Sequence, residues 1–279
     1  MKTNTPSYTA KKVAISRAEH QIFDNPIVFE DSLAIDILSD KSDIYKKRRM
    51  NRAGFSRYIR AFVAARSRYV EDKLAISFKQ GVRQYVILGA GLDTFAYRNP
   101  YPDLKVFEVD YPSTQKWKKE KLLKAEITVP DSLTYTPIDF ENQGLPEQLQ
   151  KSGFNPNEPA FFSWLGVTMY LTPEIIMETM QFIFQSTAEN QIIFDYVIPY
   201  SSKSFVHQLA FRMVNHRLRN LGEPWKCFFE PEILINNLKN IGFTEIEDIG
   251  PDDINKKYFN NRFDRLKVGG FGRLMNVKY

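Results

Sequence analysis

The stretch from Tyr85 to Arg98 reads YVILGAGLDTFAYR, and it decides the fold class. An apolar run of the kind found in buried strands leads directly into Gly89 and Gly91. Asp93 and Thr94 follow, and either side chain can cap the start of a helix. Glycines at such a turn let the backbone bend tightly and approach a ligand that a Cβ atom would exclude. The stretch therefore predicts a nucleotide-type ligand at the end of a strand in an α/β sheet.

The spacing of the glycines bears on which ligand is bound. Dinucleotide-binding proteins carry G-x-G-x-x-G, in which the third glycine allows a helix to pack closely on the strand. Here Thr94 stands at the third position, counted from Gly89. Asp110 ends the next apolar run, about 20 residues on, where an acidic residue binds ribose hydroxyls. This combination favours S-adenosyl-L-methionine (SAM) over NAD, although a plain turn with a solvated aspartate gives the same pattern.

The pattern after Gly81 indicates alternating strands and helices. Such alternation is typical of a doubly wound, mostly parallel sheet with helices on both faces. We expect one domain, in which residues 1–80 form a helical extension or lid and residues 81–279 form a Rossmann-like core. The predicted strands are Gln84–Leu88, Lys105–Val109, Leu133–Pro137, Phe161–Leu165, Gln191–Val197, Thr244–Ile249 and Phe271–Val277, and the predicted helices include Thr114–Ala125 and Pro173–Ser186.

An apolar stripe predicts a further amphipathic helix before the first strand. Arg66 falls within the stripe, whereas Arg57, Arg60 and Arg68 fall on the other side of the helix. An arginine on a buried face must find an anion, either a cofactor carboxylate or an internal acid, unless its guanidinium reaches the surface. The stripe consists of Phe55, Tyr58, Ile59, Phe62, Val63, Tyr69 and Val70.

The composition disfavours several classes of site. Cys227 is the single cysteine, and His20, His207 and His216 do not have zinc-binding spacing, so we predict no metal. We find no signal peptide and no apolar run long enough for a membrane helix, and we expect a cytoplasmic protein. The net charge of +5 permits an anionic partner. Nine basic and no acidic residues between Ile44 and Val70 raise the question of nucleic-acid binding, but we expect a solvated helix face instead.

Four motifs occur in the order and spacing of a known family: LGAGLDTFAYR (88–98), FEVDYP (107–112), PIDFEN (137–142) and GVTMYLTPE (166–174). Together with RAEHQIFDNPIVFEDSLA (17–34), they make the chain resemble the leucine carboxyl methyltransferase family from Arg17 to about Asp195. The resemblance implies a class I methyltransferase fold, with a seven-stranded sheet whose last strand is antiparallel. It also implies SAM as the cofactor.

The resemblance assigns roles to individual residues of this chain. Arg66 would pair with the SAM carboxylate, and Asp110 would bind the ribose. Thr168 and Tyr170, just after the fourth strand, lie where class I enzymes meet the acceptor, although a core tyrosine fits equally well. Leu165 stands where many members carry a glutamate that contacts the cofactor, which puts a polar contact from this strand end in doubt. The rest of the implied site consists of Gly89, Ala90 and Gly91 beside the methionine part, and Tyr111, Asp139 and Phe140 beside the adenine.

The predicted function is methyl transfer from SAM to an oxygen of a small organic acid or of a phenolic, polyketide-like metabolite. A carboxylate is already ionised at pH 7, whereas a hydroxyl acceptor needs a base. The sequence shows no evident base beside the glycines, which favours a carboxylate. Two other functions stay open: an NAD-dependent oxidoreductase, disfavoured by Thr94, and a non-catalytic SAM- or nucleic-acid-binding protein, suggested by Leu165 and the basic run. The sequence does not decide the oligomeric state.

Overall fold

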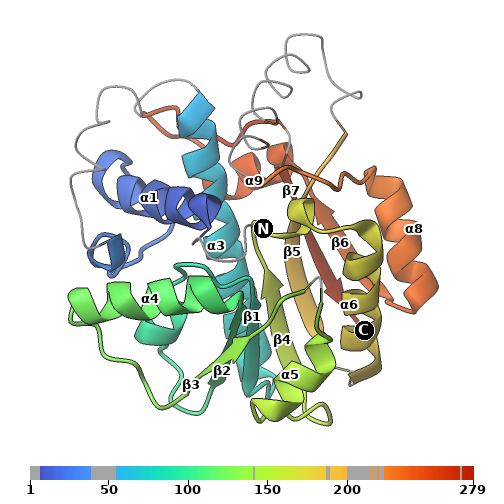
Figure 1. The fold of residues 1–279 in the computed structure, drawn as a ribbon. Helices are drawn as coiled ribbons and strands as arrows, with labels where there is room; N and C mark the ends of the chain where they lie inside the picture. The colour runs from blue at the N-terminus through green and yellow to red at the C-terminus, as the bar shows by residue number, and fades with distance from the viewer. Residues whose placement is uncertain are drawn as a thin grey trace.

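The computed structural model describes residues 7–38, 55–140, 142–186, 189–199, 215, 219, 223–270 and 272–279. Its centre is a seven-stranded sheet with the order β3-β2-β1-β4-β5-β7-β6 (Figure 1). β1 and β4 lie side by side in the middle of the sheet, and the strand order reverses between them. In doubly wound sheets, ligands bind at this reversal, beyond the carboxyl ends of the strands.

One strand runs against all the others. β1 pairs in parallel with β2 and β4, β2 pairs with β3, and β4 pairs with β5. β7 lies between β5 and β6 and is antiparallel to both, so the predicted fold class is confirmed. The predicted bounds of β1, β3 and β5 are correct to the residue, and the others shift by one residue. The strands are β1 (Gln84–Leu88), β2 (Lys105–Asp110), β3 (Leu133–Pro137), β4 (Ala160–Trp164), β5 (Gln191–Val197), β6 (Glu245–Ile249) and β7 (Gly272–Lys278).

Helices cover both faces of the sheet (Figure 1). Those in the described part of the chain are α1 (Tyr8–Phe23), α3 (Phe55–Lys79), α4 (Pro112–Lys124), α5 (Leu145–Lys151), α6 (Pro173–Ser186), α8 (Pro231–Ile241) and α9 (Pro251–Tyr258), with short 3₁₀ helices at Asp36–Leu38, Phe95–Arg98 and Thr168–Tyr170. Successive side chains of a strand point to opposite faces. Val86 and Leu88 of β1 accordingly belong to the same apolar core as residues of α5, α6 and α8, whereas Tyr85 and Ile87 belong to the core that includes residues of α3 and α9.

The N-terminal segment packs onto the sheet domain. α1 lies beside α3 (Figure 1). Ala14, Ile15 and Ala18 of α1 share a small apolar core with Leu92, next to the glycines, and with Leu122 of α4. α1 is therefore positioned by contacts with the same loop that the sequence marks as a ligand site.

The first turns of α3 differ from the predicted stripe. Tyr58 and Ile59 are 38% and 42% exposed, whereas Arg60 is only 2% exposed. The Nε and Nη2 atoms of Arg60 donate to the two carboxylate oxygens of Asp24, at 2.7 and 2.8 Å. The prediction that Arg60 lies on an exposed face was wrong, because α1 covers that side of α3 and Asp24, at its end, supplies a buried carboxylate.

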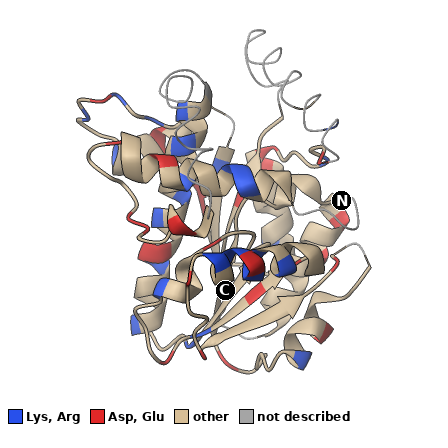
Figure 2. Ribbon diagram, turned by 60° about the vertical axis from the view of Figure 1, so that its left-hand side comes forward, with Lys and Arg blue, Asp and Glu red and all other residues tan. Residues whose placement is uncertain are grey.

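The basic run between Ile44 and Val70 is only partly described. Figure 2 shows basic and acidic residues interspersed over the described helices and loops. Arg60 and Arg66 are buried in ion pairs, and Arg68 pairs with Asp72 at the surface. Within the described ranges, no helix is long and apolar enough to cross a membrane. Lys46, Lys47, Arg48, Arg49 and Arg52 lie outside the described residues.

Candidate cofactor site

The glycine loop after β1 is a tight turn between strand ends. Gly89 and Gly91 have φ values of +68° and +49°, a region that L side chains rarely adopt. The N–H groups of Gly89 and Ala90 both donate to the carbonyl oxygen of Val109 in β2, at 2.7 and 3.1 Å. A Cβ atom on Gly89 would lie 2.2 Å from Cγ2 of Val167. The loop therefore needs glycine both for its backbone conformation and for its space.

A 3₁₀ helix, Phe95–Arg98, follows the glycine loop, with Thr94 as its N-cap residue. The Oδ1 atom of Asp93 accepts a hydrogen bond from the N–H of Phe95, at 2.8 Å. Thr94 is fully buried, and its hydroxyl donates to Oδ2 of Asp31 at 2.7 Å. The position of the third glycine in a dinucleotide motif is therefore filled by a side chain that ties the loop to the N-terminal segment.

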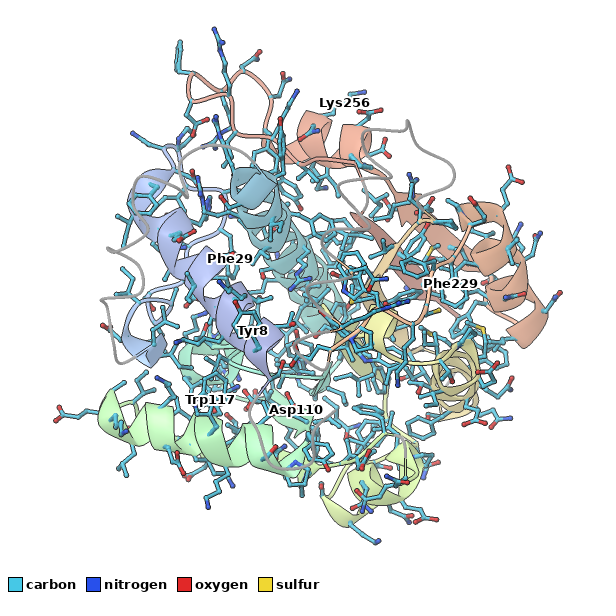
Figure 3. All side chains as sticks on the ribbon, turned by 45° about the horizontal axis from the view of Figure 1, so that its top comes forward. Tyr8, Phe29, Asp110, Trp117, Phe229 and Lys256 are labelled. Atoms are coloured by element: carbon cyan, nitrogen blue, oxygen red, sulfur yellow. The ribbon has the colours of Figure 1, made fainter. Side chains whose placement is uncertain are left out.

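Asp110 holds the glycine loop from the end of β2. Its Oδ2 accepts from the N–H of Gly91 at 2.5 Å, and its Oδ1 accepts from the N–H of Tyr111 at 2.6 Å. Burial raises the pKa of this carboxyl, and the two N–H groups offset part of that effect. Each carboxylate oxygen has a second lone pair, so Asp110 can also accept from ribose hydroxyls. Figure 3 shows Asp110 near the start of α1, where Tyr8 is labelled.

A cavity of about 260 Å³ lies at the carboxyl ends of β1, β2 and β4, with α1 and α3 forming one wall. Thr168 does not line it: this residue is 1% exposed, and its hydroxyl donates to the carbonyl oxygen of Asp195 at 2.6 Å. The other sequence-predicted residues do line it, namely Arg66, Gly89, Ala90, Gly91, Asp110, Tyr111, Asp139, Phe140, Leu165 and Tyr170.

The loop after β3 forms the side of the cavity that the resemblance gives to adenine. The Oδ2 atom of Asp139 accepts from Nδ2 of Asn142 at 2.8 Å. The backbone N–H of Asp139 donates to Oε1 of Gln143 at 2.9 Å. The ring of Phe140 stacks on Trp164 at the end of β4, with 6.1 Å between the ring centroids. These contacts hold the loop in place while both residues line the cavity.

Arg66 has a partner within the protein. Its Nη1 donates to Oδ2 of Asp195 at 2.5 Å, and the other oxygen of Asp195 accepts from the N–H of Gly166 at 2.5 Å. Gly166 has a φ of +75°, and a Cβ atom there would lie 3.0 Å from Nη2 of Arg66. The sequence analysis allowed either an internal acid or a cofactor carboxylate as the partner of Arg66, and Asp195 is such an internal acid. A guanidinium has five N–H donors, so this pair does not use up its capacity to bind a second carboxylate.

A cluster of charged residues beside the glycine loop was missed in the sequence analysis. The guanidinium of Arg17 in α1 donates to the carbonyl oxygen of Leu92, and its Nη1 donates to Oδ2 of Asp93 at 3.2 Å. Burial alone would raise the pKa of Asp93, but Arg17 and other nearby cations hold it below its usual value. Arg98 binds Glu71 of α3, with Nη1 and Oε2 2.9 Å apart. The motif around Arg17 was visible in the sequence, but nothing local showed that it folds onto the loop.

Glu223 is a second residue that was missed. It lines the cavity, and it accepts hydrogen bonds from Tyr8 and Thr9 at the start of α1. No sequence signal links positions that are more than 200 residues apart. His207 and His216, considered above as metal ligands, lie outside the described residues.

The match to known proteins covers most of the segments that build this cavity. The family model described as leucine carboxyl methyltransferase matches residues 10–184, well over half of the chain. The chain belongs to the leucine carboxyl methyltransferase family. The matched segment runs from α1 to α6 and includes the glycine loop and β1 to β4.

Proteins similar to this chain are named S-adenosyl-L-methionine-dependent methyltransferases. The chain is 34% identical over 296 residues to the "Putative S-adenosyl-L-methionine-dependent methyltransferase YktD" of Bacillus subtilis, and the alignment covers 96% of each protein. It is 32% identical over 183 residues to a similarly named protein of Mycobacterium tuberculosis, covering 61% of this chain and 58% of the relative. A crystal structure of a methyltransferase, also named "putative", from Thermobifida fusca has a TM-score of 0.58 at 13% identity, covering 98% of this chain and 95% of that one. At that identity the agreement concerns the fold.

Proposed function

We propose that this protein transfers the methyl group of SAM to a carboxylate oxygen of a small, polyketide-like organic molecule. It is a SAM-dependent methyltransferase of the leucine carboxyl methyltransferase family, and SAM is its cofactor. The observation that carries the proposal is the convergence on one cavity of the glycine loop, Asp110, the Asp139–Phe140 loop and Arg66. These groups suit, in turn, the methionine chain, the ribose, the adenine and the carboxylate of one SAM molecule.

The residues of the cavity act mainly by binding and alignment. When bound, SAM supplies a methyl group on a sulfonium whose leaving group is a neutral thioether. The glycine loop would let the backbone approach the methionine chain, and Asp110 would hold the ribose. Arg66 would bind the carboxylate end of SAM, and Tyr170 lines the same cavity. Alignment of two reacting groups in this way can lower the activation free energy of the reaction by up to about 7–11 kcal/mol.

The hydrogen bonds made by the acidic side chains in the cavity favour a methyl acceptor that is already ionised when it binds. Each described carboxylate that lines the cavity is held by donors of the protein. Tyr170 is also a poor base, because burial raises the pKa of its hydroxyl. A carboxylate acceptor needs no proton removal, whereas a phenol does. The carboxylates and the donors that hold them are Glu71 with Arg98, Asp93 with Arg17, Asp110 with Gly91 and Tyr111, Asp139 with Asn142, and Glu223 with Tyr8 and Thr9.

The identity of the cofactor can be measured directly. Calorimetry is expected to show one molecule of SAM or of S-adenosylhomocysteine bound per chain and no binding of NAD. The buried side chain of Thr94 occupies the place where the dinucleotide motif has its third glycine. Saturable binding of NAD without a response to SAM would contradict the proposal.

The acceptor oxygen can be identified from the product. Incubation of the enzyme with methyl-labelled SAM and a metabolite extract is expected to yield label that mild alkali releases as methanol, as an ester does. The rate is expected to stay nearly flat from neutral pH upward, because the acceptor is already ionised. Alkali-stable label, with a rate that rises with pH, would instead show a phenolic ether. No label, with SAM demonstrably bound, would favour the non-catalytic alternative that Leu165 leaves open.

A further inference from the structure

The two ends of α1 are held by different kinds of contact. At the carboxyl-terminal end, the contacts are buried and charged. Nδ1 of His20 lies 2.8 Å from Oδ2 of Asp24, and Asp24 in turn pairs with Arg60 of α3. Arg17, one turn earlier, pairs with Asp93 beside the glycine loop. These side chains are almost fully buried, apart from Asp93, so this end of the helix is anchored to both α3 and the loop.

At the amino-terminal end of α1, the side chain of Glu223 binds two backbone N–H groups of the helix. Oε1 of Glu223 accepts from the N–H of Tyr8 at 3.0 Å, and Oε2 accepts from the N–H of Thr9 at 3.0 Å. The hydroxyl of Thr9 also donates to Oε2, and the hydroxyl of Tyr170 donates to that of Thr9 at 3.2 Å. The first N–H groups of a helix have no acceptor within the helix, and the helix dipole favours a negative charge beside them. Glu223, which lines the cavity, therefore connects the start of α1 to the cavity wall.

Between these two ends, α1 forms a wall of the cavity. Thr9, Ala10, Val13 and Ala14 lie on one helix face and line it. The Cβ atom of Ala10 lies only 3.1 Å from the position that a Cβ atom on Gly91 would take. α1 therefore rests directly on the loop that is proposed to hold the methionine part of SAM.

We propose that Glu223 is a positioning residue that clasps the amino-terminal end of α1 over the bound cofactor. α1 opens at the Glu223 end and hinges about the end anchored by Arg17, His20 and Asp24, and this opening sets the rate of cofactor exchange. The inference rests on the proposed placement of SAM in this cavity. It adds to that proposal the end at which the helix opens and the residue that controls it.

The isosteric variant Glu223→Gln provides the first test. Glutamine has a single acceptor oxygen, and its amide NH₂ would face an N–H donor of α1, so one of the two backbone contacts is lost without a change in size. Bound, labelled S-adenosylhomocysteine is chased with an excess of unlabelled SAM. The dissociation rate is expected to rise about tenfold, as for loss of a hydrogen bond to a charged group. Thr9→Val keeps both N–H contacts and is expected to raise the rate only about threefold.

Glu230→Gln is the matched control, because Glu230 is exposed, does not line the cavity and undergoes the same chemical change. It is expected to leave the dissociation rate unchanged. Equal rates for Glu223→Gln, Glu230→Gln and the unaltered protein would overturn the clasp. If Glu223→Gln does not fold, Thr9→Val provides the test. An unchanged dissociation rate in that variant would equally contradict the proposed role of Glu223. Absence of S-adenosylhomocysteine binding to the unaltered protein would contradict the proposed function instead.

Amide hydrogen exchange tests where the helix opens. In Glu223→Gln, exchange is expected to speed up about tenfold for residues 8–13 and to stay slow for residues 18–23, because the second segment keeps its buried anchors. Saturation with S-adenosylhomocysteine is expected to slow exchange in residues 8–13. A purely structural role for Glu223 would speed exchange along the whole helix. Uniform exchange, or faster opening at the Arg17 end, would overturn the proposed hinge.

Discussion

Arg66→Ala is expected to bind SAM about 100-fold more weakly than the unaltered protein, because loss of one partner of a buried charge pair costs about 2–5 kcal/mol. The guanidinium lies on the cavity wall, and Asp195 already orients it through Nη1. Calorimetry with SAM measures the change. Arg68→Ala is the control, since Arg68 lies on the same helix with its side chain 49% exposed and pairs with Asp72 at the surface. It is expected to bind SAM normally.

A double variant separates the cofactor role of Arg66 from its internal ion pair. Arg66→Ala leaves the carboxylate of Asp195 buried and unpaired, which itself destabilises the fold. In Arg66→Gln with Asp195→Asn, two neutral amides can bond to each other, and the oxygen of the asparagine can still accept from Gly166. This protein is expected to fold but to bind SAM as weakly as Arg66→Ala. Normal affinity in the folded double variant would assign Arg66 a structural role only.

Arg60→Ala is expected to lower the free energy of unfolding by about 3–5 kcal/mol, the usual cost of breaking a buried ion pair from one side. The variant leaves Asp24 buried without the guanidinium that donates to both its oxygens. Urea denaturation at pH 7 measures the loss. Arg68→Ala again serves as the control, with an expected loss of about 1 kcal/mol or less for an exposed pair. Equal stability of the two variants would show that Asp24 does not anchor α1.

The same variant has a pH signature. Burial raises the pKa of Asp24, but hydrogen bonds from Arg60 and His20 outweigh burial, and the pKa in the folded protein lies below the ordinary value of 3.8. A lowered folded pKa gives stability that is fully present above 3.8 and is lost as the pH falls through the folded pKa. The difference in stability between the unaltered protein and Arg60→Ala is therefore expected to shrink in acid.

Features that depend on neighbouring residues were predictable from the sequence. The apolar runs of β1, β3 and β5 define their own bounds, and Gly89 and Gly91 mark a turn whose φ values only glycine adopts easily. Asp110 could be placed because the end of the second parallel strand lies beside the end of the first. Nine of the eleven predicted site residues line the cavity for this reason, since they lie at or just after strand ends that meet at one edge of the sheet, and Arg66 reaches the same cavity from α3.

The exceptions depend on contacts between distant segments. A helix with one buried face predicts one apolar stripe. α3 is instead covered on a second side by α1, and Arg60 is buried against Asp24 although it lies off the stripe. Thr168 follows a strand end but turns its hydroxyl back to the carbonyl of Asp195. Glu223 and Thr9 are 214 residues apart in the sequence, and no local sequence pattern predicts a contact between them.

The place of β7 has a consequence for synthesis on the ribosome. β7 is the last strand in the chain, yet it lies between β5 and β6. Until Gly272–Lys278 have emerged, β6 has no strand to pair with, and one edge of β5 presents unpaired backbone groups. All seven residues of β5 are buried in the finished sheet, so this open edge is apolar as well as unpaired. Such an edge is a template for pairing with another chain. The final strand thus protects the newly made protein from aggregation, and a chain that stops before Gly272 lacks that protection.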